Sequence, residues 1–150
     1  MKFNKLAGCF VMFAASTCMG QMYTVTDLGK LHIGDVGSVA SGINESGQVV
    51  GVGYSIEGGS TAHAFRTAPN RPINPVTDDF GPGTTAIGIN SSGQVVGEFR
   101  FPTLPSNGVH AFRTAPNRRL NPATDDLGTV SYDTSTATGI NDSGQGSAIT

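Results

Sequence analysis

The sequence predicts an all-β protein built from repeated units of about four short antiparallel strands, and three observations support this prediction. A nineteen-residue segment occurs twice, at residues 63–81 and 110–128, with differences at only four positions. A shorter motif, Ala-x-Gly-Ile-Asn-x-Ser-Gly-Gln, begins at Ala40, Ala86 and Ala137, so its copies lie 46 and 51 residues apart. Beyond the first twenty residues, no segment shows the apolar spacing of a helix.

The composition agrees with short strands and frequent turns. The 150 residues include 21 glycines and 8 prolines, and only 13% are charged. This glycine and proline content is high for a globular chain but lies below the range typical of disorder. A period of about 50 residues with four strands is typical of a β-propeller blade, and a β-solenoid of stacked hairpins is the alternative.

Residues 1–20 are predicted to be a signal peptide. Lys2 and Lys5 give a basic start, and an uncharged apolar run follows them. The run is shorter than the roughly 20 residues of a membrane span, so we expect no span in the mature chain. Both cysteines, Cys9 and Cys18, lie in this leader, which excludes disulfides and thiolate metal sites from the mature chain. We therefore expect a protein that is secreted or displayed on the cell surface.

The charge of the mature chain argues against one class of partner. Without Lys2 and Lys5, seven basic residues face eleven acidic ones, and no run of basic residues occurs. Such a chain does not attract a phosphate backbone, so we expect no nucleic-acid partner.

Residues 21–39 are predicted to be a partial N-terminal unit. A β-prone stretch, 23–26, leads into an Asp-Leu-Gly turn at 27–29. The same turn recurs at 79–81 and 126–128, near the end of each nineteen-residue segment. Residues 21–39 therefore resemble the tail of a unit whose front half is missing.

A hairpin opens repeat 1 (residues 40–85) and repeat 2 (86–136). We expect strands at 38–43 and 48–51, joined by a type I turn with a glycine bulge. Asparagine opens the turn because its side chain accepts a backbone hydrogen bond, and glycine closes it in the left-handed region. The turn residue after asparagine varies and is expected to face water. The structural positions of the turns are Asn44, Gly47, Asn90, Gly93, Asn141 and Gly144.

The repeated His-Ala-Phe-Arg segment is predicted to be a strand. By alternation, His63 and Phe65 share one face, with phenylalanine in the core, and Arg66 points to solvent. His110 and Phe112 are the equivalent residues. We expect each histidine to bond a neighbouring backbone group, because near-identical units do not separate the pKa values of an acid and a base.

The connections between these strands differ in kind. Residues 68–71 are expected to turn at a proline, and 72–75 can form at most a short edge strand. The variable segments 51–62 and 97–109 are expected to be surface loops.

Repeat 3, residues 137–150, is predicted to be truncated. The Val-Val-Gly expected after Gln145 is replaced, and no His-Ala-Phe strand follows. Propellers close with four to eight blades, so the fold is incomplete as given. We expect further repeats in a longer chain, or other copies of this one.

With the hairpin and the His-Ala-Phe strand together, the sequence resembles the HAF-repeat family of probable extracellular bacterial proteins. The resemblance covers nearly everything after the leader. It implies a secreted or surface-exposed β-repeat protein with no established activity. Members often carry tryptophan soon after His-Ala-Phe, whereas this chain has Thr67 and Thr114 and no tryptophan.

No catalytic, cofactor-binding or metal-binding site is predicted. The acidic pairs could offer oxygen ligands to Ca²⁺, but each pair supplies too few oxygens, and turn capping is the preferred interpretation. These calcium candidates are Asp78, Asp79, Asp125 and Asp126. Five arginines are interpreted as solvated, with a face for carboxylates or acidic sugars as the alternative: Arg66, Arg71, Arg113, Arg118 and Arg119.

The predicted function is a non-enzymatic interaction or adhesion scaffold for an unknown surface or matrix ligand. The variable segments 54–62 and 99–109 are expected to recognise that ligand. Two alternatives stay open: a fragment of a propeller-type enzyme whose catalytic residues lie outside this chain, and a truncated copy without function.

Overall fold

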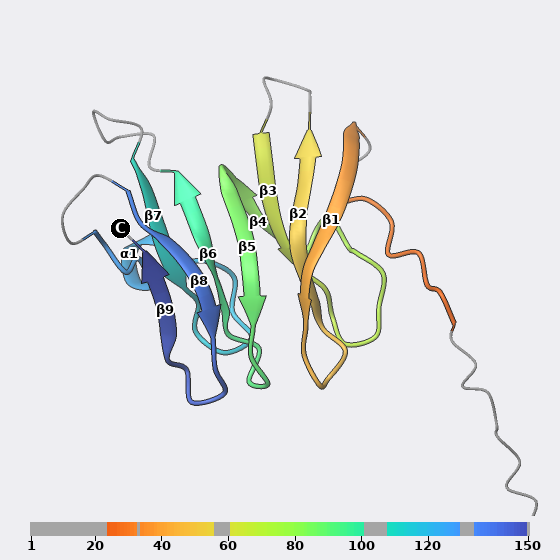
Figure 1. Cartoon of the computed structure of the whole chain (residues 1–150). Coiled ribbons are helices and arrows are strands. Elements are labelled where there is room, and N and C mark those ends of the chain that lie inside the picture. Colours follow the sequence, from red (N-terminus) through yellow and green to blue (C-terminus); the bar gives the residue numbers. More distant parts are fainter. Residues whose placement is uncertain (1–23, 33, 56–60, 101–107, 130–133, 150) are drawn as a thin grey trace, which may run out of the picture.

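The computed structural model describes residues 24–32, 34–55, 61–100, 108–129 and 134–149. The predicted signal peptide lies outside these residues. The described chain folds into three antiparallel sheets, which we name A, B and C in chain order. Figure 1 shows that they stack one after another along the molecule.

Each sheet comes from one continuous stretch of sequence. Sheet A has the order β1 (Asp35–Ile43), β2 (Val49–Ser55), β3 (Thr61–Arg66) and β4 (Asp79–Pro82). Sheet B contains β5 (Thr84–Ile89), β6 (Val95–Arg100) and β7 (Val109–Arg113), and sheet C contains β8 (Thr136–Ile140) and β9 (Gly146–Ile149). Neighbouring strands are joined in order of sequence, so every pairing is local.

The sheets pack face to face through small and aliphatic side chains. Strand β5 lies across β1, β2 and β3, and β8 lies across β5, β6 and β7. The core between sheets A and B is formed by Val50, Ala64, Ala86, Val95, Phe99 and Phe112. A smaller core between sheets B and C is formed by Val96, Ala111 and Ala137. Burial of this apolar area holds the stack together.

Both faces of sheet A are covered, which explains a departure from the expected alternation. Ala64 and Phe65 are adjacent in β3, and both are buried although they point to opposite faces. Sheet B covers the face of Ala64. The N-terminal segment lies on the other face, where Leu31 is against Gly53. The side of the strand expected to face solvent is therefore an interface.

The hairpin turns have the predicted conformation. Gly47, Gly93 and Gly144 have φ angles of +78°, +75° and +76°, in the left-handed region that favours glycine. In each turn the glycine N–H donates to the carbonyl of the asparagine three residues earlier, as in a type I turn. The variable residue after asparagine is exposed in all three copies.

The fourth strand lies where the sequence predicted a turn. Residues 79–82 form β4, because Phe65 and Asp79 are paired across β3 and β4. The segment 72–75, considered as an edge strand, is not a strand. In repeat 2 the four-residue helix α1 (Pro122–Asp125), which Asn121 caps, replaces the turn at 75–78 of repeat 1, and only a single bridge joins Phe112 to Asp126 in the place of β4. The sequence analysis expected no helix after the leader, and α1, a single helical turn, is the exception.

The strands also extend beyond their expected ends. Strand β1 begins at Asp35, within the segment assigned to the partial N-terminal unit, and β2 and β6 continue to Ser55 and Arg100. The stretch 24–26, part of a segment described as β-prone, is not a strand. The all-β class is confirmed, and the sheets are not closed into a barrel. Among the described residues, no helix is long and apolar enough to cross a membrane.

Candidate functional site

The repeated turn residues link each unit to the next one. The side-chain amide of Asn44 donates to the carbonyl of Asn90 at 3.0 Å, and that of Asn90 donates to the carbonyl of Asn141 at 3.1 Å. Each asparagine also uses its Oδ1 within its own turn, where it accepts from the serine hydroxyl two residues on and from the glutamine N–H four residues on. The asparagine side chain is thus an acceptor, as expected. Two residues on, however, its donor is the serine hydroxyl and not the serine backbone N–H.

The Ala-Pro-Asn-Arg turn lies against the hairpin turn of its own unit. Asn70 has a φ of +54°, and its N–H donates to the carbonyl of Gly47 at 2.9 Å. Asn117 has a φ of +55° and donates to Gly93 in the same way at 3.2 Å. Gln48 then bonds Asn117 across the units at 3.1 Å. The two repeated turns therefore form one polar end of the stack.

The arginine of His-Ala-Phe-Arg also bridges units. Arg66 donates to the carbonyl of Gly93 at 3.1 Å and to that of Arg118 at 2.9 Å, and its guanidinium lies 5.7 Å from the centre of the Phe80 ring. Arg113 donates to the carbonyl of Gly144, the equivalent contact one unit on. Burial lowers the pKa of Arg66, and the Asp78 carboxylate acts in the opposite direction. The expectation of a solvated Arg66 is wrong, because the next sheet covers this face.

Two of the calcium candidates have both carboxylate oxygens engaged within their turns. Asp78 is buried, and it accepts from the Asn74 N–H at 2.8 Å and from the Thr77 hydroxyl at 2.9 Å. Asp125 accepts from the Asn121 N–H at 2.7 Å and from the Thr124 hydroxyl at 3.1 Å. The two carboxylates close the turns before β4 and before the Asp126 bridge.

The other two calcium candidates pair with the repeated histidines. His63 Nδ1 lies 3.1 Å from Asp79 Oδ1, and His110 Nδ1 lies 3.1 Å from Asp126 Oδ1. The partner of each histidine is thus a carboxylate rather than the expected backbone group. The pairing follows from the sheet, because the second aspartate of each Asp-Asp pair lies opposite the His-Ala-Phe strand.

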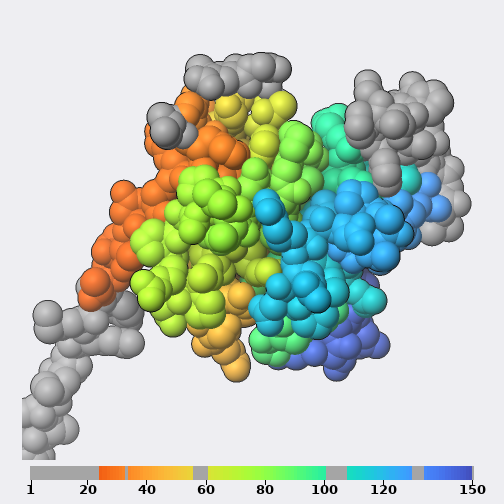
Figure 2. Space-filling model, turned by 180° about the vertical axis from the view of Figure 1, so that it is seen from behind, coloured from red at the N-terminus to blue at the C-terminus, as the bar shows by residue number. Residues whose placement is uncertain are grey.

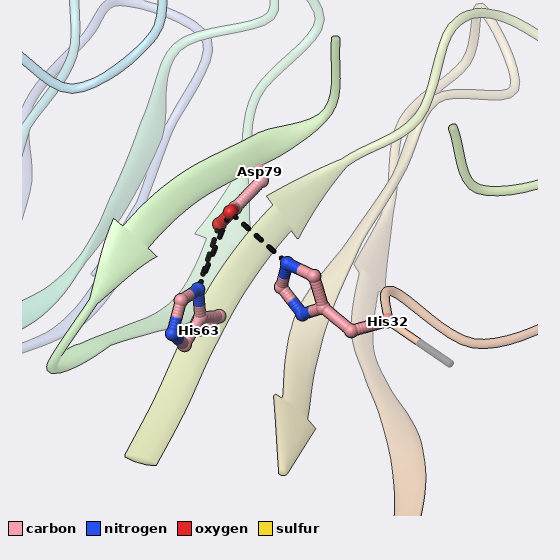
Figure 3. Close-up of side chains that lie close together, drawn as sticks. All are labelled: His32, His63 and Asp79. Atoms are coloured by element: carbon pink, nitrogen blue, oxygen red, sulfur yellow. Dashed lines mark hydrogen bonds and ion pairs between the residues drawn. The ribbon is translucent and has the colours of Figure 1, made fainter. Parts of the chain in front are cut away.

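Repeat 1 adds a third member to this pair. His32 Nε2 lies 3.4 Å from Asp79 Oδ2, and the rings of His32 and His63 meet edge to face with centroids 4.9 Å apart. Figure 3 shows the two imidazoles on either side of the Asp79 carboxylate. The sequence analysis assigned no role to His32. The signal that could have placed it is the Asp-Leu-Gly turn at 27–29, which marks this segment as a neighbour of repeat 1.

Two repeated threonines are also buried and hydrogen-bonded. Thr67 and Thr114, at the place compared with tryptophan, are both 1% exposed. Their hydroxyls accept from the N–H groups of Val49 and Val95 at 2.9 Å. Val49 and Val95 are the first residues of β2 and β6, the strands that follow the repeated turns. The position compared with tryptophan is therefore occupied by a hydroxyl group that accepts a hydrogen bond from the start of such a strand.

The connecting segments of the two repeats meet on one side of the molecule. In Figure 2 residues around 70–82 and 115–128 form neighbouring patches on this face. Arg119 bonds the carbonyl of Asp79, and Arg66 bonds that of Arg118. Five arginines were considered as a face for acidic ligands. Of these, Arg66, Arg113 and Arg119 bond backbone carbonyls through their side chains.

A cleft of about 320 Å³ lies between sheets A and B, at the end opposite the repeated turns. Its lining residues carry an aromatic ring, both signs of charge and three hydroxyl groups. They are Tyr54, Thr61, Ala62, Gly83, Thr85, Glu98, Arg100 and Val109. Five of the eight belong to the variable segments 54–62 and 99–109, which the sequence analysis expected to recognise a ligand. Residues 56–60 and 101–107 lie outside the described residues.

Comparisons with known protein families, with curated proteins and with solved structures gave no match. The resemblance to the HAF-repeat family therefore depends on the motifs alone, and the function is argued from the geometry described above.

Proposed function

We propose that the chain is an exported, non-enzymatic β-repeat scaffold that recognises a polysaccharide through the cleft between sheets A and B. One observation carries the proposal. The repeated side chains are used to hold the units together, whereas the segments that vary between units converge on one cleft. Constant positions build such a scaffold, and variable positions give it specificity.

The lining of the cleft matches the chemistry of a sugar. Tyr54 lies on the face of β2 that carries Val50 and Val52, toward sheet B, and is 44% exposed. Its ring offers an apolar surface for the C–H face of a pyranose and a hydroxyl at its tip. Arg100 supplies a strong donor for sugar hydroxyl groups, and Glu98 supplies an acceptor, although its Oε2 also accepts from the Thr136 hydroxyl at 2.9 Å. Five of the eight lining residues carry a hydroxyl group or a charge, which favours a polar ligand over a lipid.

The test is a glycan array probed with the untagged chain, residues 21–150, followed by calorimetric titration with the oligosaccharide that binds. We expect binding to at least one class of bacterial or host polysaccharide. Tyr54→Ala should weaken it by about tenfold or more, because one aromatic stacking contact is worth about 1 kcal/mol beyond its buried area. Arg100→Ala should weaken it further, by removal of a charged donor.

Arg71→Ala is the matched control, because Arg71 is exposed at the opposite end of sheet A, beside Gly47. This variant should bind like the wild type. Absence of binding to every glycan, or equal affinities of the Tyr54 variant and the control, would refute the proposal.

A further inference from the structure

We infer that His32, His63 and Asp79 form a binding site for Zn²⁺, which fastens the N-terminal segment onto sheet A. The three residues come from separate parts of the chain. His32 precedes β1, His63 lies in β3 and Asp79 begins β4. This site is independent of the cleft and goes beyond the scaffold function.

The ligand atoms are close to the spacing that a tetrahedral ion requires. One nitrogen from each histidine and one Asp79 oxygen all lie within 4.8 Å of one another. Asp79 Oδ2 lies 3.3 Å from His63 Nδ1 and 3.4 Å from His32 Nε2. With zinc–ligand bonds of about 2.0–2.1 Å, ligand atoms of a tetrahedral site lie roughly 3.3 Å apart. Two of the three edges therefore already have about this length, and the third, between the two nitrogens, is no longer than 4.8 Å.

A buried carboxylate supports His32 from behind. The Asp35 side chain is 1% exposed, and its Oδ1 has no hydrogen-bond partner, although it lies 3.6 Å from His32 Nδ1. Its Oδ2 accepts the backbone N–H of His32 at 2.9 Å, which fixes the residue in place. A histidine that ligates a metal through one nitrogen usually donates from the other to a carboxylate. Asp35 therefore occupies the position expected of such a partner.

The second repeat contains the same pair of residues. His110 and Asp126 repeat the 3.1 Å contact of His63 and Asp79. Across the described ranges, however, His32, His63 and Asp79 are the one group of three metal-ligating side chains found this close together. The site thus depends on His32, which only the N-terminal segment supplies.

The donor set selects the metal. Two imidazole nitrogens and one carboxylate suit Zn²⁺, whereas Ca²⁺ requires six to eight oxygens. The sequence analysis predicted no metal site and named Asp79 only as a calcium candidate. The proposal differs in giving Asp79 the role of a Zn²⁺ ligand. Three protein ligands leave one position for water. His32 is held in the N-terminal segment and the other two ligands in sheet A, so the ion would join the two.

The test is titration of the untagged, metal-free chain with Zn²⁺ by calorimetry, together with Co²⁺ substitution followed by visible absorption. We expect one ion per chain and the intense absorption of four-coordinate Co²⁺. His32→Ala should abolish both, and it should preserve the fold because the His32 side chain is 36% exposed. Asp35→Asn should weaken Zn²⁺ binding by about 10- to 100-fold, the usual effect of removing such a supporting partner.

His110→Ala is the matched control, because it removes the equivalent histidine of the second repeat, which is not one of the three proposed ligands. Its Zn²⁺ affinity should equal that of the wild type. Circular dichroism confirms that each variant is folded. The inference is overturned if the wild type takes up no Zn²⁺, if His32→Ala binds as tightly as the wild type, or if His110→Ala loses the same affinity as His32→Ala.

Discussion

The phenylalanine ring of the His-Ala-Phe strand explains why the last residue of the hairpin motif is glycine: a larger residue there would collide with the ring. A Cβ atom added at Gly97 would lie 2.0 Å from the carbonyl oxygen of Thr85 and 2.9 Å from the ring of Phe112. At Gly51 the same atom would lie 2.0 Å from the Val39 carbonyl oxygen and 2.8 Å from the Phe65 ring. The glycine leaves space for the ring of its paired residue, so two motifs separated in sequence form one packing unit.

Gly97→Ala should destabilise the protein by at least about 1–3 kcal/mol, the usual cost of inserting a group into a close-packed core. The clash is with backbone as well as with an aromatic ring, so a rotamer change cannot relieve it. The measurement is the free energy of unfolding in urea, which reports the loss as a lower midpoint.

Gly139→Ala provides the comparison within the same motif. A Cβ there would meet only the Ser147 hydroxyl, at 3.6 Å. Its stability should stay within about 0.5 kcal/mol of the wild type. Equal losses in the two variants would mean that the close approach at Gly97 is not what requires glycine.

At the scale of elements, the hairpin turns of sheets B and C are each held by an arginine from a strand of the preceding sheet. Arg66 extends from β3 to the turn between β5 and β6, and Arg113 from β7 to the turn between β8 and β9. A guanidinium that donates to backbone carbonyls forms stronger hydrogen bonds than a neutral donor. The turns are thus fixed by charge-assisted bonds as well as by their own backbone hydrogen bonds.

Arg66→Met should lower the free energy of unfolding by about 1.5–3 kcal/mol, the range for a hydrogen bond to a charged group. Methionine keeps much of the aliphatic length of the side chain, but it removes the guanidinium that lies over the Phe80 ring and leaves the carbonyls of Gly93 and Arg118 without this donor. Urea unfolding followed by circular dichroism measures the change.

The control for Arg66→Met is Arg71→Met, because both replace one arginine in the same repeat and Arg71 is exposed. The control should unfold within about 0.5 kcal/mol of the wild type. If both variants lose the same stability, the effect comes from the removed charge and not from the bridge.

The sequence predicted what is local and missed what depends on stacking. Glycine and asparagine determine the hairpin turns by their own backbone preferences, so these were placed correctly. The fourth strand was missed because Asp79 and Phe80 resemble a turn until Phe65 is available as a partner. The pairing of His32 with Asp79 joins residues on different elements, and no periodicity indicates it.

At the scale of the whole molecule, stability should differ along the stack. Among the described residues, the strand pairs with substantial contact lie within one sheet or in neighbouring sheets. As in other repeat proteins, local stability is then expected to follow the area that each interface buries. Sheet C has two strands, and all four residues of β9 are exposed. Its smaller core with sheet B is joined by polar contacts from the turns. Sheet C should therefore open before the rest.

One of those polar contacts makes the docking of sheet C sensitive to pH. Asp142 Oδ1 accepts the N–H of Ser91 at 2.8 Å, and this bond lowers the pKa of Asp142 below its ordinary value of 3.8. A carboxyl whose pKa is lower in the folded state contributes stability above its unfolded pKa and loses it as the pH falls through the folded value. The docked arrangement of sheet C should therefore weaken below about pH 4.

Hydrogen exchange followed by NMR tests this expectation, with the amides of β2 as an internal reference for the intrinsic pH dependence of exchange. In the wild type, protection of the Ser91 amide and of β8 should fall relative to β2 between pH 5 and pH 3. Asp142→Asn keeps an acceptor oxygen that does not titrate, so its relative protection should stay constant over this range. A constant ratio in the wild type, or the same fall in the variant, would show that Asp142 does not control the docking, because only the ionised carboxylate distinguishes the two proteins.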